Sequence, residues 1–209
     1  MLLLSCLFAV SIAVGSPAVI SWVAPEVPPK PRWAAIALAP LFALALSMAG
    51  AAVISDSVLF ALAVGMVSAV LATQLVIDIC VKRLPRVLSY SGAVAFFLIA
   101  AFVPRGSNAG VAGMISGIVL MTAITGILVF FSRGALGIGD LHLAPLLGSI
   151  IGWYDPFGVL LAWMVAAIAG GSFVLIAMVM RRINRGSMVA YGPFLMLGTV
   201  VSVLWSAGR

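Results

Sequence analysis

Only five side chains in this 209-residue chain carry a carboxylate, so few residues are candidates for acid–base chemistry. They are Glu26, Asp56, Asp78, Asp140 and Asp155. Glu26 lies in a proline-rich stretch, and the sequence around Asp56 and Asp155 is typical of solvated turns. Asp78 and Asp140 are therefore the residues to which chemistry can be assigned.

Asp78 closes a long apolar run, Leu-Ala-Thr-Gln-Leu-Val-Ile-Asp, and a basic pair begins four residues later at Lys82. A carboxylate at the edge of the bilayer hydrocarbon is costly and usually functional. The alternative is a structural ion pair with Lys82 at the i,i+4 position of a helix. The run around Asp78 alone does not decide between these two roles.

Asp140 ends the sequence Gly137-Ile138-Gly139-Asp140 and precedes another apolar segment. An aspartate at the start of a helix can cap it, because its oxygen accepts hydrogen bonds from unpaired backbone N–H groups. The two glycines allow a tight turn and the close approach of another part of the chain.

The composition requires a membrane environment for these residues. Hydrophobic residues make up 65% of the chain and charged residues only 8%, against about 25% charged in soluble domains. The formal net charge of +6 comes from short gaps between apolar runs, so it indicates membrane orientation and not nucleic-acid binding. Two cysteines and one histidine provide neither a disulfide framework nor a metal-ligand cluster.

Apolar runs predict eight membrane segments, at residues 2–23, 34–54, 58–79, 88–104, 109–131, 141–152, 157–180 and 188–206. The sixth is short for a span of about 20 residues, so it is a half-span or begins earlier, within 134–140. The expected fold is an all-α, polytopic transmembrane helix bundle. Residues 1–56 would form an N-terminal two-span region with a short linker, and residues 57–209 the membrane domain that carries both aspartates.

The basic residues predict the orientation of this bundle. Alternate gaps place nine of them on one side: Lys30, Arg32, Lys82, Arg83, Arg86, Arg133, Arg181, Arg182 and Arg185. The other side receives only Arg105 and Arg209. The positive-inside rule makes the first side cytoplasmic, which leaves both termini outside and puts Asp78 and Asp140 at the cytoplasmic face.

Two carboxylates at one depth suggest chemistry on a shared proton. If they are close, they do not both ionise easily, so one can act as an acid while the other activates water. This is how aspartic proteases work. His142, two residues after Asp140, is predicted to tune this pair, to contact substrate, or simply to face solvent. Lys82 and Arg83 are further candidates for substrate contact.

Three motifs resemble those of the type IV prepilin peptidases. Gly137-Ile-Gly139-Asp140 resembles the family's Gly-x-Gly-Asp motif, and Asp78 followed by Lys82-Arg83-Leu84-Pro85 resembles its first aspartate motif. Ala-Tyr-Gly192-Pro193-Phe resembles its Phe-Gly-Pro element. The family often has Lys at the position of His142 and Asn or Asp at that of Arg86, and its large members carry a zinc domain that has no counterpart here.

The resemblance implies an enzyme, a protease of the cytoplasmic (inner) membrane of a prokaryote. Its catalytic pair would be Asp78 and Asp140, with motif support from Gly137, Gly139, Pro85, Gly192 and Pro193. It would remove the basic leader from prepilins or pseudopilins without a metal. S-adenosylmethionine would be its cofactor only if it also methylates the product. The implied partners are the substrate and membrane lipid, and no oligomeric state is specified.

Three alternatives stay open at this stage. The first is a presenilin-like intramembrane protease, although Ile77 precedes Asp78 here where such proteins have Tyr. The second is a small transporter that uses Asp78 and Asp140 as ion ligands, although such sites usually lie near the membrane midplane. The third is a scaffold for pilus or secretion assembly that has lost catalysis.

Overall fold

The computed structural model describes residues 58–81, 84–103, 109–132, 136–181 and 191–207 of the chain. Within these ranges the regular structure is entirely helical: α4 (Val58–Val81), α5 (Arg86–Ala101), α6 (Gly110–Phe131), α7 (Ile138–Tyr154), α8 (Gly158–Val179) and α9 (Gly192–Ala207). The all-α expectation is confirmed for this part. The segments predicted at 2–23 and 34–54, and the linker between them, lie outside the described residues.

The six predicted segments from 58 onward each correspond to one helix. The starts of α6 and α8 differ by one residue, those of α5 and α9 differ by more, and α7 begins within the alternative range 134–140. Helix α5 begins at Arg86, two residues early, because Pro85 with φ −68° is well suited to the position before the first turn. Helix α7 begins at Ile138 and so includes Asp140 in its first turn. Helix α9 begins at Gly192, four residues later than predicted, with Pro193 in the first turn, where a missing N–H is tolerated.

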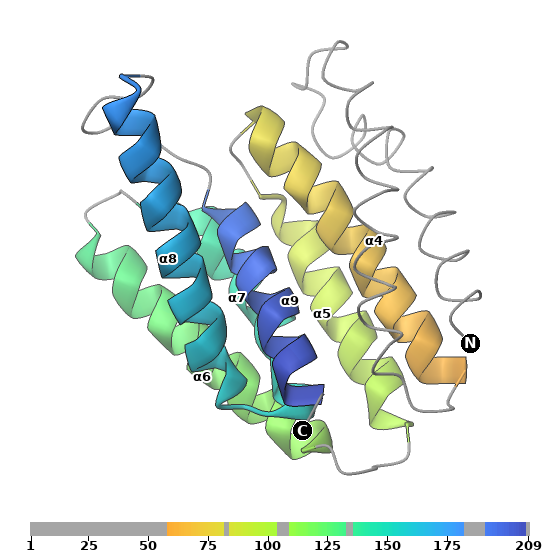
Figure 1. Ribbon diagram of the computed structural model, residues 1–209. Coiled ribbons are helices and arrows are strands. Elements are labelled where there is room, and N and C mark those ends of the chain that lie inside the picture. Colours follow the sequence, from red (N-terminus) through yellow and green to blue (C-terminus); the bar gives the residue numbers. More distant parts are fainter. Residues whose placement is uncertain (1–57, 82–83, 104–108, 133–135, 182–190, 208–209) are drawn as a thin grey trace.

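Successive helices run in opposite directions and pack as one bundle (Figure 1). Helices α7 and α9 lie centrally, between the α4–α5 pair and the α6–α8 pair (Figure 1). Because the direction alternates, the end of α4 and the starts of α5, α7 and α9 all lie at the same end of the bundle (Figure 1). Three segments that are distant in sequence therefore meet there.

Glycines bring α6 and α7 into backbone contact. A Cβ atom at Gly148 would lie 2.5 Å from the carbonyl oxygen of Gly117, and one at Gly117 would lie 2.7 Å from Cα of Gly152. Small residues at such crossings are the usual way in which helices associate in lipid, where no hydrophobic force draws them together. This contact fixes α7, and with it Asp140, against the rest of the bundle.

Aromatic residues fill the end of the bundle opposite the aspartates. The rings of Phe60 and Trp153 stack with centroids 5.3 Å apart, and Phe96 packs 6.4 Å from Phe60. All three side chains are almost completely buried. This apolar cluster joins the start of α4 to the end of α7 and so holds the two aspartate-bearing helices together.

The outer surface of the bundle has membrane character. Within the described residues, α6 and α8 are long and apolar enough to cross a bilayer. Large apolar side chains along them, such as Val119 at 62% and Ile168 at 63%, are exposed. An apolar surface of this extent is matched by lipid and not by water.

Candidate active site

Asp78 lies in the last turn of α4 and is buried, with 4% of its surface exposed. Its carboxylate accepts a hydrogen bond from the backbone N–H of Gly192, at the start of α9. Its Oδ2 atom has no hydrogen-bond partner among the described residues. Asp78 is therefore a buried carboxylate that is only partly satisfied, which is costly and unusual in a purely structural residue.

Asp140 is the third residue of α7 and is buried to the same degree, at 4% exposed. The prediction that Asp140 caps this helix is wrong, because the helix begins at Ile138 and the capping position belongs to Gly137. Asp140 instead reaches back and accepts a hydrogen bond from the N–H of Gly137. This is the acidic half of a capping box, and it fixes the carboxylate at the helix start.

The structure places Asp78 and Asp140 close enough for their charges to interact. They come from α4 and α7, 62 positions apart in the printed sequence. Leu84, from the motif that carries Asp78, packs near the glycines of the other two motifs. If Gly192 carried a Cβ atom, that atom would lie 3.4 Å from Cδ1 of Leu84, an ordinary contact distance. If Gly139 carried one, it would lie 3.2 Å from the Cβ of Leu84.

The three motif glycines have different roles. A Cβ at Gly192 would lie 2.6 Å from Oδ2 of Asp78, and a Cβ at Gly139 would lie 3.3 Å from the backbone nitrogen of Leu84. A Cβ at Gly137 would make only an ordinary contact, 3.6 Å from Oδ2 of Asp140. The close approach expected at Gly137 and Gly139 therefore occurs at Gly139 and not at Gly137, and Gly192 makes a further one that was not expected.

Neither glycine before Asp140 adopts the conformation that only glycine tolerates. Gly137 has φ −74°, and among the described glycines a positive φ occurs only at Gly110, at 63°. The tight turn expected at the Gly-x-Gly element is thus not the reason for these glycines. At Gly139 the reason is the contact with Leu84.

The two motif prolines each lie at a helix start. Pro85 immediately precedes α5, and Pro193 is the second residue of α9. Both positions tolerate the missing N–H and are favoured by the fixed φ of proline. They define where these helices begin beside Leu84 and Gly192.

Within the described part of the chain, the hydrogen-bond partner of His142 is on α5 and is neither of the two carboxylates. Its Nδ1 lies 2.8 Å from the Tyr90 hydroxyl on α5, and the rings meet edge to face at 5.7 Å. The charge of Arg86 also acts on His142. His142 therefore ties α7 to α5 beside Asp140. Lys82 and Arg83, the other predicted substrate contacts, lie outside the described residues.

Tyr191 is a neighbour of the site that the sequence analysis did not single out. Burial raises the pKa of its hydroxyl, and the negative charge of Asp140 raises it further. Its ring stacks on Trp163 with centroids 5.9 Å apart and also contacts Phe194. The sequence signal that could have identified Tyr191 is its position directly before Gly192 in the third motif. A tyrosine at the start of a helix does not by itself indicate a functional site.

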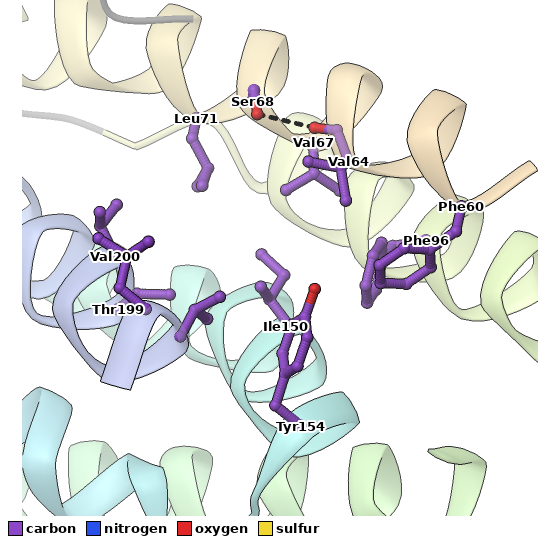
Figure 2. Close-up of a pocket in the computed structure, with 12 residues that line it drawn as sticks. Phe60, Val64, Val67, Ser68, Leu71, Phe96, Ile150, Tyr154, Thr199 and Val200 are labelled. Atoms are coloured by element: carbon purple, nitrogen blue, oxygen red, sulfur yellow. Dashed lines mark hydrogen bonds between the residues drawn. The ribbon is translucent and has the colours of Figure 1, made fainter. Parts of the chain in front are cut away.

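An apolar pocket runs along the interior of the bundle on the same face of α4 as Asp78. It is lined by side chains of α4, α5, α7 and α9, among them Val64, Val67 and Leu71 (Figure 2). These three residues and Asp78 recur at spacings of three, four and seven, which places them on one helix face. Tyr154 points into the space from α7, and Val200 and Thr199 face it from α9 (Figure 2).

The residues present suit acid–base chemistry. Over the described ranges, His, Cys, Asp and Glu do not gather in any group of three that would hold a metal ion. The arrangement provides two buried carboxylates at one end of a helical bundle, and an apolar pocket deeper in the bundle whose α4 lining extends from Phe60 to Leu71. That combination can activate water and polarise a carbonyl group.

Comparison with known proteins identifies the family. The profile of the type IV leader peptidase family matches residues 65–175, just over half of the chain, and this region includes both aspartates. No curated protein and no solved structure gave a match. The resemblance noted from the motifs is confirmed, and the family implies a peptidase that acts on prepilin-type substrates. The chain belongs to the type IV leader peptidase family.

Proposed function

We propose that this protein is an aspartic endopeptidase and that Asp78 and Asp140 are its catalytic pair. The observation that supports this most directly is the pairing of two buried carboxylates, from helices far apart in sequence, close enough for their charges to interact. Buried like charges are retained in proteins where their chemistry is needed.

The reaction proceeds on a single shared proton. One carboxyl group keeps its proton while the other is charged, because two adjacent carboxylates do not both ionise readily. The charged group takes a proton from water as the water oxygen attacks the scissile carbonyl carbon, and the protonated group donates to the carbonyl oxygen. The tetrahedral intermediate collapses when its C–N bond breaks and the leaving nitrogen receives a proton from the pair.

The substrate is a prepilin-type protein whose apolar helix lies in the bilayer. Its apolar side chains enter the pocket lined by Val64, Val67 and Leu71, which lies on the face of α4 that leads to Asp78. The scissile bond then reaches the dyad, and the basic leader extends beyond the membrane edge. The same pocket face and dyad thus set both the depth and the position of the cut.

The site faces the cytoplasm in an inner membrane that the chain crosses eight times, with both termini outside. Nine of the eleven basic residues fall on one side of that arrangement, which supports this orientation. Labelling single cysteines introduced at Arg105 and Arg133 with a membrane-impermeant reagent tests it. Labelling from outside at position 133, but not at 105, would reverse the orientation.

The enzymatic proposal is tested by co-expressing the protein with a prepilin-like substrate and measuring the intact mass of the product. Wild type removes the leader, whereas Asp78→Asn and Asp140→Asn leave the precursor intact. Asp155→Asn is the matched control, because Asp155 lies at the other end of α7 and its Oδ1 accepts a hydrogen bond from Phe157 that an asparagine oxygen also accepts.

Retained cleavage in either dyad variant, with the protein confirmed in the membrane, would refute the proposal. The same spectrum reports the second activity that the family resemblance raised. An added methyl mass on the product, dependent on S-adenosylmethionine, would show N-methylation, and an unmodified product would limit the enzyme to proteolysis.

A further inference from the structure

A buried hydrogen-bonded bridge joins α4 to α5 one helical turn before Asp78. Nε2 of Gln74 donates to Oγ of Ser89 at 2.8 Å, and both side chains are fully buried, at 0% exposed. Oγ of Ser89 in turn donates to the carbonyl oxygen of Pro85 at 3.4 Å, and the Ser89 N–H donates to the same oxygen at 3.3 Å. The bridge therefore runs from Gln74 to the turn that precedes α5.

That turn carries the residue around which the site is assembled. Leu84 directly precedes Pro85 and packs against Gly139 and Gly192, the glycines of the other two motifs. Any movement of the turn relative to α4 would shift Leu84, and the segments that carry Asp140 and the Gly192 N–H would shift with it. A polar bridge buried inside a helical pair specifies such a position more strictly than apolar packing does.

Gln74 also has an unused oxygen on the side-chain amide. Among the described residues, the buried side-chain carbonyl or carboxylate oxygens without a hydrogen-bond partner are Oε1 of Gln74 and Oδ2 of Asp78. The two residues are four positions apart in one helix and so share a face. An O–H donor placed between the two oxygens, either a carboxyl proton or a water molecule, would satisfy both acceptors.

We propose that Gln74 is a positioning residue of the dyad. Anchored by Ser89, it fixes the Leu84–Pro85 turn on which the two motif glycines pack, and its free carbonyl oxygen orients the O–H group shared with Asp78. This inference rests on the proposed function, since it concerns the geometry of the catalytic pair. Gln74 acts through Asp78 and Leu84 and does not itself contact the scissile bond.

Two substitutions remove the bridge while preserving volume. Gln74→Met keeps the length of the side chain without its hydrogen bonds, and Ser89→Ala removes the partner hydroxyl. Each is expected to lower kcat about 10- to 100-fold, the effect of misplacing catalytic groups by a fraction of an ångström to one ångström. KM should stay within about twofold, because the pocket is unchanged. Ser89→Thr keeps the hydroxyl and should restore most of kcat.

The double variant Gln74→Met/Ser89→Ala tests whether the two residues act as one unit. Its loss should match that of Gln74→Met alone, because a bridge can be broken only once. Two matched controls carry buried hydroxyls bonded within their own helices: Thr73→Val, which loses a bond to Ala69, and Ser149→Ala, which loses a bond to Leu146. Both should keep wild-type kcat.

The outcomes separate this inference from the proposed function. Unchanged kcat in Gln74→Met, or fully additive losses in the double variant, would overturn the role of Gln74 while Asp78→Asn remains inactive. If Gln74→Met fails to accumulate in the membrane, the contrast between Ser89→Ala and Ser89→Thr decides alone, and equal kcat in both overturns the inference. Cleavage by Asp78→Asn in the same assay would instead refute the dyad.

Discussion

Replacing Gly192 by alanine should abolish most of the activity without destabilising the fold. The added Cβ would lie 2.6 Å from Oδ2 of Asp78, whereas ordinary contacts begin at 3.4 Å, so the carboxylate must move by about 0.8 Å. A misplacement of about 1 Å at a reacting group is worth roughly 100-fold in rate. We therefore expect kcat/KM to fall by about two orders of magnitude.

The same substitution should leave stability unchanged or raise it. The atom in conflict is the end of a rotatable side chain and not backbone, and the next nearest atoms, Cγ of Asp78 and Cδ1 of Leu84, are both at an ordinary 3.4 Å. Alanine in place of glycine in a compatible conformation stabilises proteins by about 0.4–1 kcal/mol, because the unfolded chain loses freedom. Lower activity with an equal or higher unfolding temperature is a combination that general damage to the bundle does not produce.

The assay measures leader removal from a purified prepilin-like substrate in detergent or proteoliposomes, together with thermal unfolding of each variant. Gly137→Ala is the control, because its Cβ would lie 3.6 Å from Oδ2 of Asp140 and displaces nothing. Wild-type kcat/KM in Gly192→Ala would show that Asp78 need not keep its position and would contradict the dyad geometry. An equal loss in Gly137→Ala would show that the distances do not govern the effect.

Three other substitutions test separate parts of the structure. Gly148→Ala brings a Cβ to 2.5 Å from the carbonyl oxygen of Gly117. We therefore expect the free energy of unfolding, measured by heat or denaturant, to fall by about 1–3 kcal/mol. An unaltered unfolding temperature would refute the close α6–α7 packing. Val200→Phe fills the pocket and should raise KM roughly tenfold in the cleavage assay, with kcat preserved. The control Val119→Phe, on the exposed face of α6, should change neither constant. Equal KM values in the two variants would exclude the pocket as the substrate site. Tyr90→Phe removes the 2.8 Å contact with His142 Nδ1 but leaves the edge-to-face ring contact. The free energy of unfolding should therefore fall by only about 1 kcal/mol or less. A larger loss would show that this exposed pair stabilises the bundle more than one hydrogen bond does.

The described helices were predictable from the sequence because charged or proline residues interrupt the apolar runs between them. Their ends were less so. Counting apolar residues passes over Arg86, which begins α5 because the preceding proline sets the backbone, and it leaves the start of α7 open within 134–140. The first turn of a helix depends on backbone conformation and hydrogen bonding, which hydropathy does not report.

The candidate carboxylates were also identifiable, because isolated aspartates at the edges of apolar segments are rare enough to stand out. The contacts that support them were not. Leu84 belongs to the first motif in sequence, but its contacts with Gly139 and Gly192 become visible only in the folded structure. Gln74 and Ser89 are 15 residues apart, and only the antiparallel packing of α4 on α5 makes them partners. Tertiary contacts of this kind leave no periodic signal in one sequence.

The geometry also explains why three short motifs occur together in one chain. The Leu84–Pro85 turn, the Gly139–Asp140 helix start and the Gly192–Pro193 helix start converge at one end of the bundle, where Leu84 packs on both glycines. A side chain at Gly192 would enter the space that Asp78 occupies, and a Cβ at Gly139 would crowd Leu84, whose Cβ and backbone nitrogen would lie 3.2 and 3.3 Å away. Each motif therefore supplies one part of a single contact. A change in any of the three should move the same pair of carboxylates, which is why Gly192, distant in sequence from both aspartates, is expected to control the position of one of them.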